Sequence, residues 1–256
     1  MKSQPEETTE DTVYQGRVRL VQPVKGFRAG FDSLLLAAAL PVLDKGEALE
    51  LGCGCGGALL PAAFRMPQVA FTGLEVSASV TEMARNGSEL NGFGTRVTIE
   101  NTEASEWVKP HENRFDLVFA NPPYFESGKI SEPGEGKASA YIETLTLEAW
   151  IKAMIHTAKP RAPVILVHRA AELARLLAQL DRQAGEITVL PIASKAGAPA
   201  RRVLVRGRKG LKRGPLTLLP PLITHTDDGS ARTPAAQAII EGQALLWPAS
   251  GKTDFP

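Results

Sequence analysis

The chain has 256 residues, enough for one or two domains with a full hydrophobic core. With 43% hydrophobic and 22% charged residues its composition is globular, which excludes disordered, collagen-like and coiled-coil chains. The net charge is +1, from 29 Lys and Arg against 28 Asp and Glu, so nucleic acid binding through overall charge alone is not expected. A basic face confined to one part of the surface is compatible with this value.

We expect neither a membrane span nor a secretory signal in this sequence. The longest uncharged apolar stretch covers only residues 33–43, about half of what crosses a bilayer. The N-terminus is acidic and has no apolar core. The two cysteines, Cys53 and Cys55, are separated by one residue and can frame neither a disulfide scaffold nor a four-ligand zinc site. We therefore expect a cytoplasmic protein without a metal.

The chain opens with acidic residues and almost nothing apolar, which predicts a disordered tail over residues 1–12 and one domain over 13–256. Short apolar runs then alternate with segments of helical period. This alternation predicts an α/β fold in which helices cover both faces of a mostly parallel, twisted sheet. The expected strands are 48–51, 69–74, 97–99, 115–120, 163–167 and 187–190, and the expected helices are 58–66, 77–90, 145–158 and 170–180.

Several residues mark element boundaries. Asp32 is positioned to cap a helix over 33–40 that Pro41 ends, and Ser77 to cap the helix that follows the second strand. Pro61 conflicts with a helix over 58–66 unless it lies in the first turn.

Two later segments depart from the alternation. Residues 125–142 form a long polar loop, and loops of this length are usually functional or disordered. From about residue 200 a C-terminal extension adds a strand over 202–206, a basic turn and a last helix from about Pro234.

A glycine-rich sequence, ELGCGCGG at residues 50–57, directly follows the first strand. Glycines here let the backbone approach a ligand closely at the carboxyl edge of a sheet. Two readings are open. The dinucleotide fingerprint G-x-G-x-x-G is matched by Gly52, Gly54 and Gly57, and the S-adenosylmethionine pattern E/D-x-G-x-G-x-G by Glu50, Gly52, Gly54 and Gly56. Both readings use Glu75, which ends the second strand and can accept hydrogen bonds from ribose hydroxyls.

The fourth strand ends in Asn121-Pro122-Pro123-Tyr124, which should lie beside the glycine loop. The prolines fix the turn, so that the Asn121 amide oxygen and the Pro122 carbonyl form two acceptors aimed at one point. An NH2 group offers two matching donors, and Tyr124 offers a ring that can stack on a planar group. Methyl transfer to a planar nitrogen requires this arrangement, whereas hydride transfer does not.

In this order of motifs the sequence resembles the class I, Rossmann-like S-adenosylmethionine-dependent methyltransferases that act on amino groups. Residues 26–36 (GFRAGFDSLLL) and 119–125 (FANPPYF) resemble more closely the bacterial tRNA (adenine-N6)-methyltransferases, which modify the adenine beside the anticodon of valine tRNA. Residues 199–205 and 233–237 are also similar to that family. The resemblance covers about residues 15–245.

The resemblance implies S-adenosylmethionine as the cofactor. Gly52, Gly54 and Gly56 would surround its methionine part, with Glu50 bracing the loop, and Glu75 would hold its ribose. Glu103 stands where the family has an Asp near the adenine of the cofactor. The family's element that closes over the cofactor is matched by Arg28 and Asp32. Asn121 would serve both cofactor and substrate, and Pro122, Pro123 and Tyr124 would complete the catalytic group.

A basic segment, residues 187–226, contains eight Lys and Arg and no Asp or Glu. A solvated edge strand protected by cations has the same composition. Because the methyltransferase motifs imply a macromolecular partner, we expect this segment to bind RNA. The expected contacts are Arg201, Arg202, Arg206, Arg208 and Lys209.

The sequence therefore favours methyl transfer from S-adenosylmethionine to the N6 amino group of an adenine in tRNA, without a membrane or an obligate protein partner. The same motif also fits protein glutamine, rRNA guanine or DNA adenine as the acceptor. A nicotinamide-dependent oxidoreductase and a catalytically silent RNA-binding relative stay open as alternatives.

Overall fold

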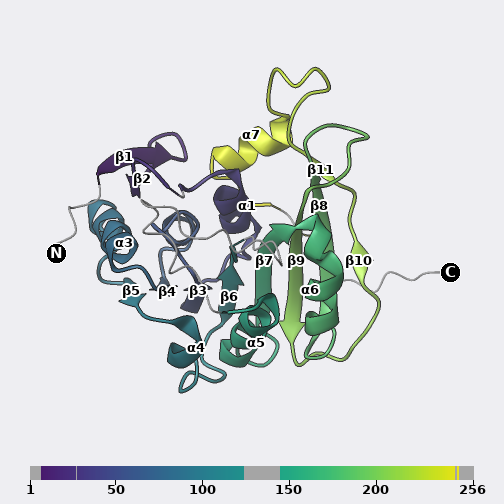
Figure 1. Cartoon of the computed structure of the whole chain (residues 1–256), viewed down its shortest axis with the longest axis horizontal. Helices are drawn as coiled ribbons and strands as arrows, with labels where there is room; N and C mark the ends of the chain where they lie inside the picture. Colours follow the sequence, from purple (N-terminus) through teal and green to yellow (C-terminus); the bar gives the residue numbers. More distant parts are fainter. Residues whose placement is uncertain (1–6, 27, 124–144, 246, 248–256) are drawn as a thin grey trace, which may run out of the picture.

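The computed structural model of the chain describes residues 7–26, 28–123, 145–245 and 247. Within these ranges a nine-stranded sheet forms the centre of the molecule (Figure 1). Its spatial order is β5 (Val97–Asn101), β4 (Val69–Glu75), β3 (Gly46–Leu51), β6 (Leu117–Ala120), β7 (Pro163–Arg169), β9 (Arg202–Lys209), β8 (Ala184–Ala193) and β10 (Thr217–Leu218), with β11 (Leu222–Ile223) also paired to β8. Only β9 is antiparallel to its neighbours, so the predicted mostly parallel sheet is confirmed.

Helices cover both faces of this sheet, as the alternation predicts. One face carries α1 (Phe31–Ala39), α2 (Leu59–Arg65), α3 (Ala78–Leu90) and α7 (Pro234–Ile240). The other carries α4 (Ala104–Trp107), α5 (Leu147–Thr157) and α6 (Leu173–Leu180), the last preceded by a 3-10 turn (Ala170–Glu172). Successive residues of β6 alternate between the two cores, Leu117 and Phe119 on one side and Val118 and Ala120 on the other. No helix in the described ranges is both long and apolar enough to cross a membrane.

Helix α1 is almost wholly buried, and distant segments complete its ends. It ends before Pro41 as predicted, but its N-cap is Gly30, so the prediction that Asp32 caps it is wrong. The helix begins at Phe31, which places Asp32 inside the first turn, where its carboxylate pairs with Arg202 at 2.9 Å (Nε to Oδ2). At the other end the Ala39 carbonyl accepts a hydrogen bond from the Trp247 indole at 2.6 Å.

The other boundary residues behave as their chemistry requires. Helix α2 begins at Leu59, so Pro61 lies in the first turn, where an amide N–H has no helical partner to lose. Ser77 is the N-cap residue of α3, although its side chain makes no capping hydrogen bond, and Asn91 is the C-cap. The predicted long loop at 125–142 lies outside the described residues.

The predicted disordered tail is wrong for residues 8–12. They belong to β1 (Thr8–Val13), which pairs antiparallel with β2 (Val18–Pro23), and β2 packs on α3 (Figure 1). The acidic side chains that suggested a solvated tail have partners here, since Glu10 pairs with Arg19 at 2.8 Å and Asp11 with Arg28 at 2.5 Å. Residues 1–6 lie outside the described part.

Candidate active site

The candidate site lies at the carboxyl edge of the sheet, where β6, β3 and β4 are neighbours. Because the three strands are parallel, the residues that follow them come together: Asn121 after β6, the glycine loop after β3, and Glu75 at the end of β4. A recess opens between the first two. Its walls are Ala29, Ser33, Glu50, Gly52, Cys53, Gly54, Cys55, Gly57, Ala58 and Asn121.

The glycine loop needs its glycines for two different reasons. Gly54 has φ +56° and nothing within 4 Å of the place where a Cβ would stand, so its outer side is open toward the recess. At Gly57 a Cβ would lie 2.4 Å from the Ala29 Cβ, so this glycine lets the segment before α1 close on the loop. Gly56, predicted to line the cofactor site, is not in the recess wall, and a side chain there would meet Leu60.

Glu50 is buried in the wall of the recess, with only 2% of its surface exposed. Its Oε2 atom has no hydrogen-bond partner. Burial raises the pKa of Glu50 well above its usual value, opposed by the Leu59 amide and reinforced by the nearby Glu75 carboxyl. A buried carboxylate oxygen without a partner costs free energy, so this atom is suited to a donor or cation supplied by a ligand.

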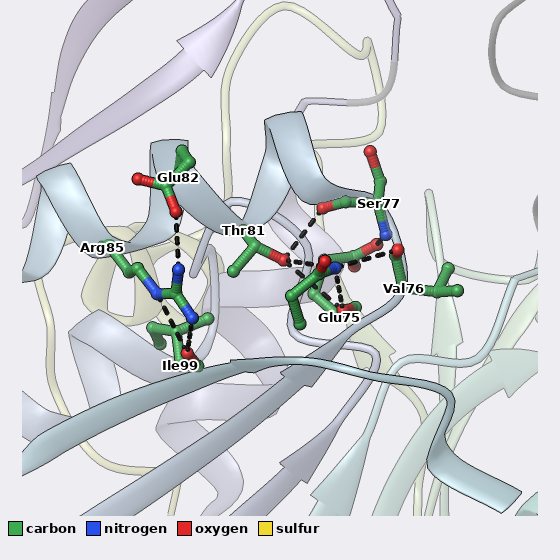
Figure 2. A network of polar contacts seen from close by, with 8 residues as sticks. Glu75, Val76, Ser77, Thr81, Glu82, Arg85 and Ile99 are labelled. Atoms are coloured by element: carbon green, nitrogen blue, oxygen red, sulfur yellow. Dashed lines mark hydrogen bonds and ion pairs between the residues drawn. The ribbon is translucent and has the colours of Figure 1, made fainter.

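Glu75 is held by a polar network at the end of β4, and Figure 2 shows its members on α3 and β5. Its Oε2 accepts from the Gly54 amide at 3.1 Å and its Oε1 from the Ser77 amide at 2.8 Å. Burial raises the pKa of this carboxyl, although the same two amides oppose the shift. The Asn101 amide, on the neighbouring strand, donates to the backbone carbonyls of Glu75 at 3.1 Å and Val76 at 2.9 Å. The carboxylate is thus fixed in direction at the end of β4.

The same network fastens α3 to the sheet. The Thr81 hydroxyl donates to the Ser77 carbonyl at 2.8 Å, and Arg85 donates twice to the Ile99 carbonyl, at 3.0 and 2.7 Å (Figure 2). Val76, which directly follows Glu75, is 42% exposed. It offers an apolar surface beside the acid that the sequence motifs did not single out.

Asn121 lies in the wall of the recess, directly after β6. The following Pro122 is buried and Pro123 is half-buried, in line with a rigid turn. Tyr124, the last member of the predicted catalytic group, lies outside the described residues. The strand and the recess therefore bring Asn121 next to the glycine loop, as the parallel sheet predicts.

Besides Gly56 and Glu75, three further predicted cofactor residues do not line the recess. Arg28 turns toward the N-terminal hairpin, where its guanidinium donates to Thr9 Oγ1 at 2.9 Å and the Pro23 carbonyl at 2.7 Å. Asp32 faces Arg202. Glu103 is the N-cap residue of α4, beyond the end of β5. From the motif that suggested Arg28 and Asp32, the structure instead brings Ala29 and Ser33 into the wall.

The predicted RNA contacts fall into two groups at opposite ends of β9. Arg202 faces Arg169 at the carboxyl end of β7, whereas Arg208 faces Pro163 at its beginning, about 20 Å away along the strand. Exposed Arg201 belongs to the first group. The second group is engaged within the chain: Arg208 pairs with Glu186 at 3.2 Å, and Lys209 donates to Asn113 Oδ1 at 2.8 Å.

Arg206 lies between these groups and is half-buried. Its guanidinium carbon stands 4.6 Å from the centre of the Trp247 ring, and burial lowers its pKa. The sequence segment therefore looks like one basic stripe, but only its first members share an edge with the recess.

The carboxylates at the recess distinguish S-adenosylmethionine from a dinucleotide, the two ligands that the glycine pattern allowed. S-adenosylmethionine carries positive charge on its sulfur and its ammonium group, which complements the unpartnered Glu50 oxygen and the fixed Glu75 carboxylate. A dinucleotide would bring its anionic pyrophosphate to the same loop, where the Glu50 carboxylate would repel it. The recess thus fits the methionine part of S-adenosylmethionine.

Comparisons with known proteins agree with this chemistry. Residues 28–133 match the family model described as the methyltransferase small domain. The chain is 29% identical, over 70% of its length and 73% of the relative's, to the tRNA1(Val) (adenine(37)-N6)-methyltransferase of Yersinia pestis (strain Pestoides F), with the same values for that of Yersinia pseudotuberculosis (serotype O:1b, strain IP 31758).

Solved structures show the same fold. A predicted O-methyltransferase from Agrobacterium tumefaciens superposes with a TM-score of 0.70 at 25% identity, covering 84% of this chain and 98% of that one. The structure of M. jannaschii TYW2 in complex with AdoMet superposes with a TM-score of 0.58 at 11% identity, covering 81% and 88% of the two chains. The fold is that of the class I, Rossmann-like methyltransferases.

Proposed function

We propose that this chain, a class I methyltransferase that depends on S-adenosylmethionine, methylates the N6 amino group of an adenine in tRNA. The observation that carries the proposal is the position of Asn121, which follows β6 and shares a recess with Glu50 and the glycine loop. An acceptor fixed beside a cation-binding recess is what transfer to a planar amino group requires.

Asn121 and Pro122 would hold the amino group of the substrate. The side-chain oxygen of Asn121 and the carbonyl of Pro122 each accept one N–H of the amine, which turns the nitrogen lone pair toward the recess. The rigid turn after β6 keeps both acceptors in place, so little entropy is lost when the base binds. This role is one of positioning and electrostatics, since neither group needs to exchange a proton with the substrate.

Glu50, Glu75 and the glycine loop would hold the cofactor. When bound, S-adenosylmethionine supplies a methyl group on a positively charged sulfur. Glu50 lines the recess and its Oε2 has no hydrogen-bond partner, so it can accept a hydrogen bond from a cationic ammonium group. Glu75 is anchored by two backbone amides and directed by Asn101, so its remaining lone pairs can accept from both ribose hydroxyls.

The choice of tRNA is supported by the named activity of the Yersinia relatives and by the cations on the same edge of the sheet. Exposed Arg201 is positioned to contact phosphates of a loop whose base enters the recess, and Arg202 beside it also pairs with Asp32. Moving an unpaired loop base out of its stack costs little free energy, which favours an anticodon loop over a duplex as the substrate. A tRNA substrate also implies a cytoplasmic location.

Nucleoside mass spectrometry tests the proposal. Unmodified tRNA is incubated with the protein and S-adenosylmethionine, digested, and compared with a reaction that contains Asn121→Ala. We expect N6-methyladenosine from the wild type only, while S-adenosylhomocysteine still binds both proteins. If the methylated product were instead guanine in RNA, adenine in DNA or a protein glutamine, that molecule would be the substrate in place of tRNA adenine. Stabilisation by NAD in place of S-adenosylhomocysteine would overturn the chemistry, and tRNA binding without methylation would indicate a silent relative.

A further inference from the structure

Gln22, on β2, is a buried amide that no sequence motif singled out, with 4% of its surface exposed. Its side-chain hydrogen bonds reach three separate segments. Its Oε1 accepts from the Ala29 amide at 2.7 Å and from the Cys55 thiol at 3.6 Å, and its Nε2 donates to Asp11 Oδ2 at 2.9 Å. One side chain therefore ties the N-terminal hairpin to the segment before α1 and to the glycine loop.

Two of these three partners are walls of the recess, Ala29 on one segment and Cys55 on the other. The two segments also touch directly, because Gly57 leaves no room for a side chain against Ala29. The Gln22 oxygen thus sits behind both walls and holds their backbone and thiol donors on a single acceptor. A change at this atom would alter the separation of the walls without touching a ligand in the recess.

The third partner, Asp11, explains why position 22 requires an amide side chain. Asp11 is itself fixed by Arg28 at 2.5 Å and by the Thr9 hydroxyl at 3.0 Å, so its carboxylate offers Gln22 an acceptor that cannot move away. Position 22 therefore needs an acceptor on one side and a donor on the other. A glutamate there would place two carboxylates face to face, and a methionine would leave the Ala29 amide without its partner.

We propose that Gln22 is a positioning residue for cofactor binding, which sets the recess by holding Ala29 and Cys55 on its side-chain oxygen and the hairpin on its side-chain nitrogen. This rests on the assignment of the recess to S-adenosylmethionine. The N-terminal hairpin acts on the cofactor through this amide, although the hairpin itself supplies no residue to the recess wall.

The test compares Gln22→Met with Gln237→Met, which removes an exposed glutamine that donates to Glu241 at 2.9 Å. Affinity for S-adenosylhomocysteine is measured by calorimetry, and stability by urea unfolding. We expect Gln22→Met to weaken S-adenosylhomocysteine binding and raise KM for S-adenosylmethionine by about tenfold, with kcat within about twofold. Gln237→Met should change neither. Loss of stability at Gln22→Met with unchanged affinity and KM would overturn the proposal.

A reciprocal exchange separates positioning from simple damage to the fold. Gln22→Glu alone should weaken S-adenosylhomocysteine binding, because it turns a donor–acceptor contact with Asp11 into a repulsion. The double variant Gln22→Glu/Asp11→Asn reverses donor and acceptor and keeps the total charge, so it should restore affinity to within about threefold. A double variant as weak as the worse single variant would contradict the proposal. None of these measurements involves tRNA, so they succeed or fail separately from the substrate proposed above.

Discussion

The two ends of the central sheet carry similar acidic side chains, but these differ in whether they have ion-pair partners within the chain. At the amino end Asp116 pairs with Lys159 at 2.8 Å, Glu47 with Arg114 at 3.0 Å, and Asp181 with Arg213. At the carboxyl end the Glu50 carboxylate has an oxygen without a partner, and the Glu75 carboxylate accepts hydrogen bonds from the backbone amides of Gly54 and Ser77. These three acids at the amino end are paired within the chain, whereas Glu50 and Glu75 at the carboxyl end have acceptors to offer a ligand.

The pKa values follow the same division. Although partial burial would raise it, the hydrogen bonds from Lys159 and the Glu47 amide hold the pKa of Asp116 below its usual value. Burial without a cation raises the pKa values of Glu50 and Glu75. A carboxylate kept away from water and from side-chain cations is a cost that a cationic ligand can relieve, which is why the comparison points to function.

The largest expected difference between the ends is catalytic. Asn121→Ala should lower kcat by about 100-fold or more, because it removes an acceptor that orients the reacting amine. Asn113→Ala, which removes the asparagine that accepts from Lys209 at the amino end, should leave kcat within about twofold. Steady-state methylation assays with tRNA measure both. Equal losses in the two variants would remove the distinction between the ends.

The glycine loop gives the next largest effect. Gly54→Ala should weaken S-adenosylhomocysteine binding by about tenfold, because the new methyl group occupies the open side of the loop. The matched control is Gly92→Ala, at φ +69° after α3 and likewise with nothing within 4 Å. Both changes strain the backbone by about 1–2 kcal/mol. Calorimetry should therefore separate them although urea unfolding does not.

The divided basic segment predicts a smaller effect on RNA. Arg201→Glu, at the carboxyl end, should raise KM for tRNA by about fivefold and reduce its dependence on salt. Lys212→Glu, exposed at the amino end between β9 and β10, should leave KM for tRNA within about twofold. Titrations at two salt concentrations check this. A stronger effect at Lys212 would mean that RNA follows the whole basic segment.

The smallest effect concerns stability and has opposite sign at the two ends. Glu50 has a folded-state pKa above 4.5, because the folded protein favours its protonated form. The contribution of Glu50 to the free energy of unfolding is therefore greatest at low pH and is lost as the pH rises through that raised pKa. Asp116 has a folded-state pKa below 3.8, so its contribution is present above 3.8 and is lost as the pH falls.

Relative to the wild type, Glu50→Gln should therefore gain free energy of unfolding as the pH rises above 4.5. Asp116→Asn should be less stable by about 0.5–1 kcal/mol at neutral pH and should approach the wild type in acid. Urea unfolding across a pH series measures both differences. If the two differences changed with pH in the same direction, the contrast between the ends would be wrong.

The sequence by itself determined the α/β class, seven strands of the central sheet, and the glycine loop with Glu75 and Asn121 at strand ends, because periodicity and turn chemistry are local properties. Parallel strands also end at one edge, so the meeting of these motifs could be inferred before any side chain was placed.

The tertiary structure alone decided which side chains became partners. Asp32 looked like a helix cap until Arg202, 170 residues away, was brought beside it. The acidic N-terminus looked solvated until β2 and Arg28 paired with it. The basic segment looked continuous until the antiparallel β9 sent its cations to opposite ends of the sheet. A polar side chain is fixed by the neighbours that folding supplies, and those neighbours are distant in the sequence.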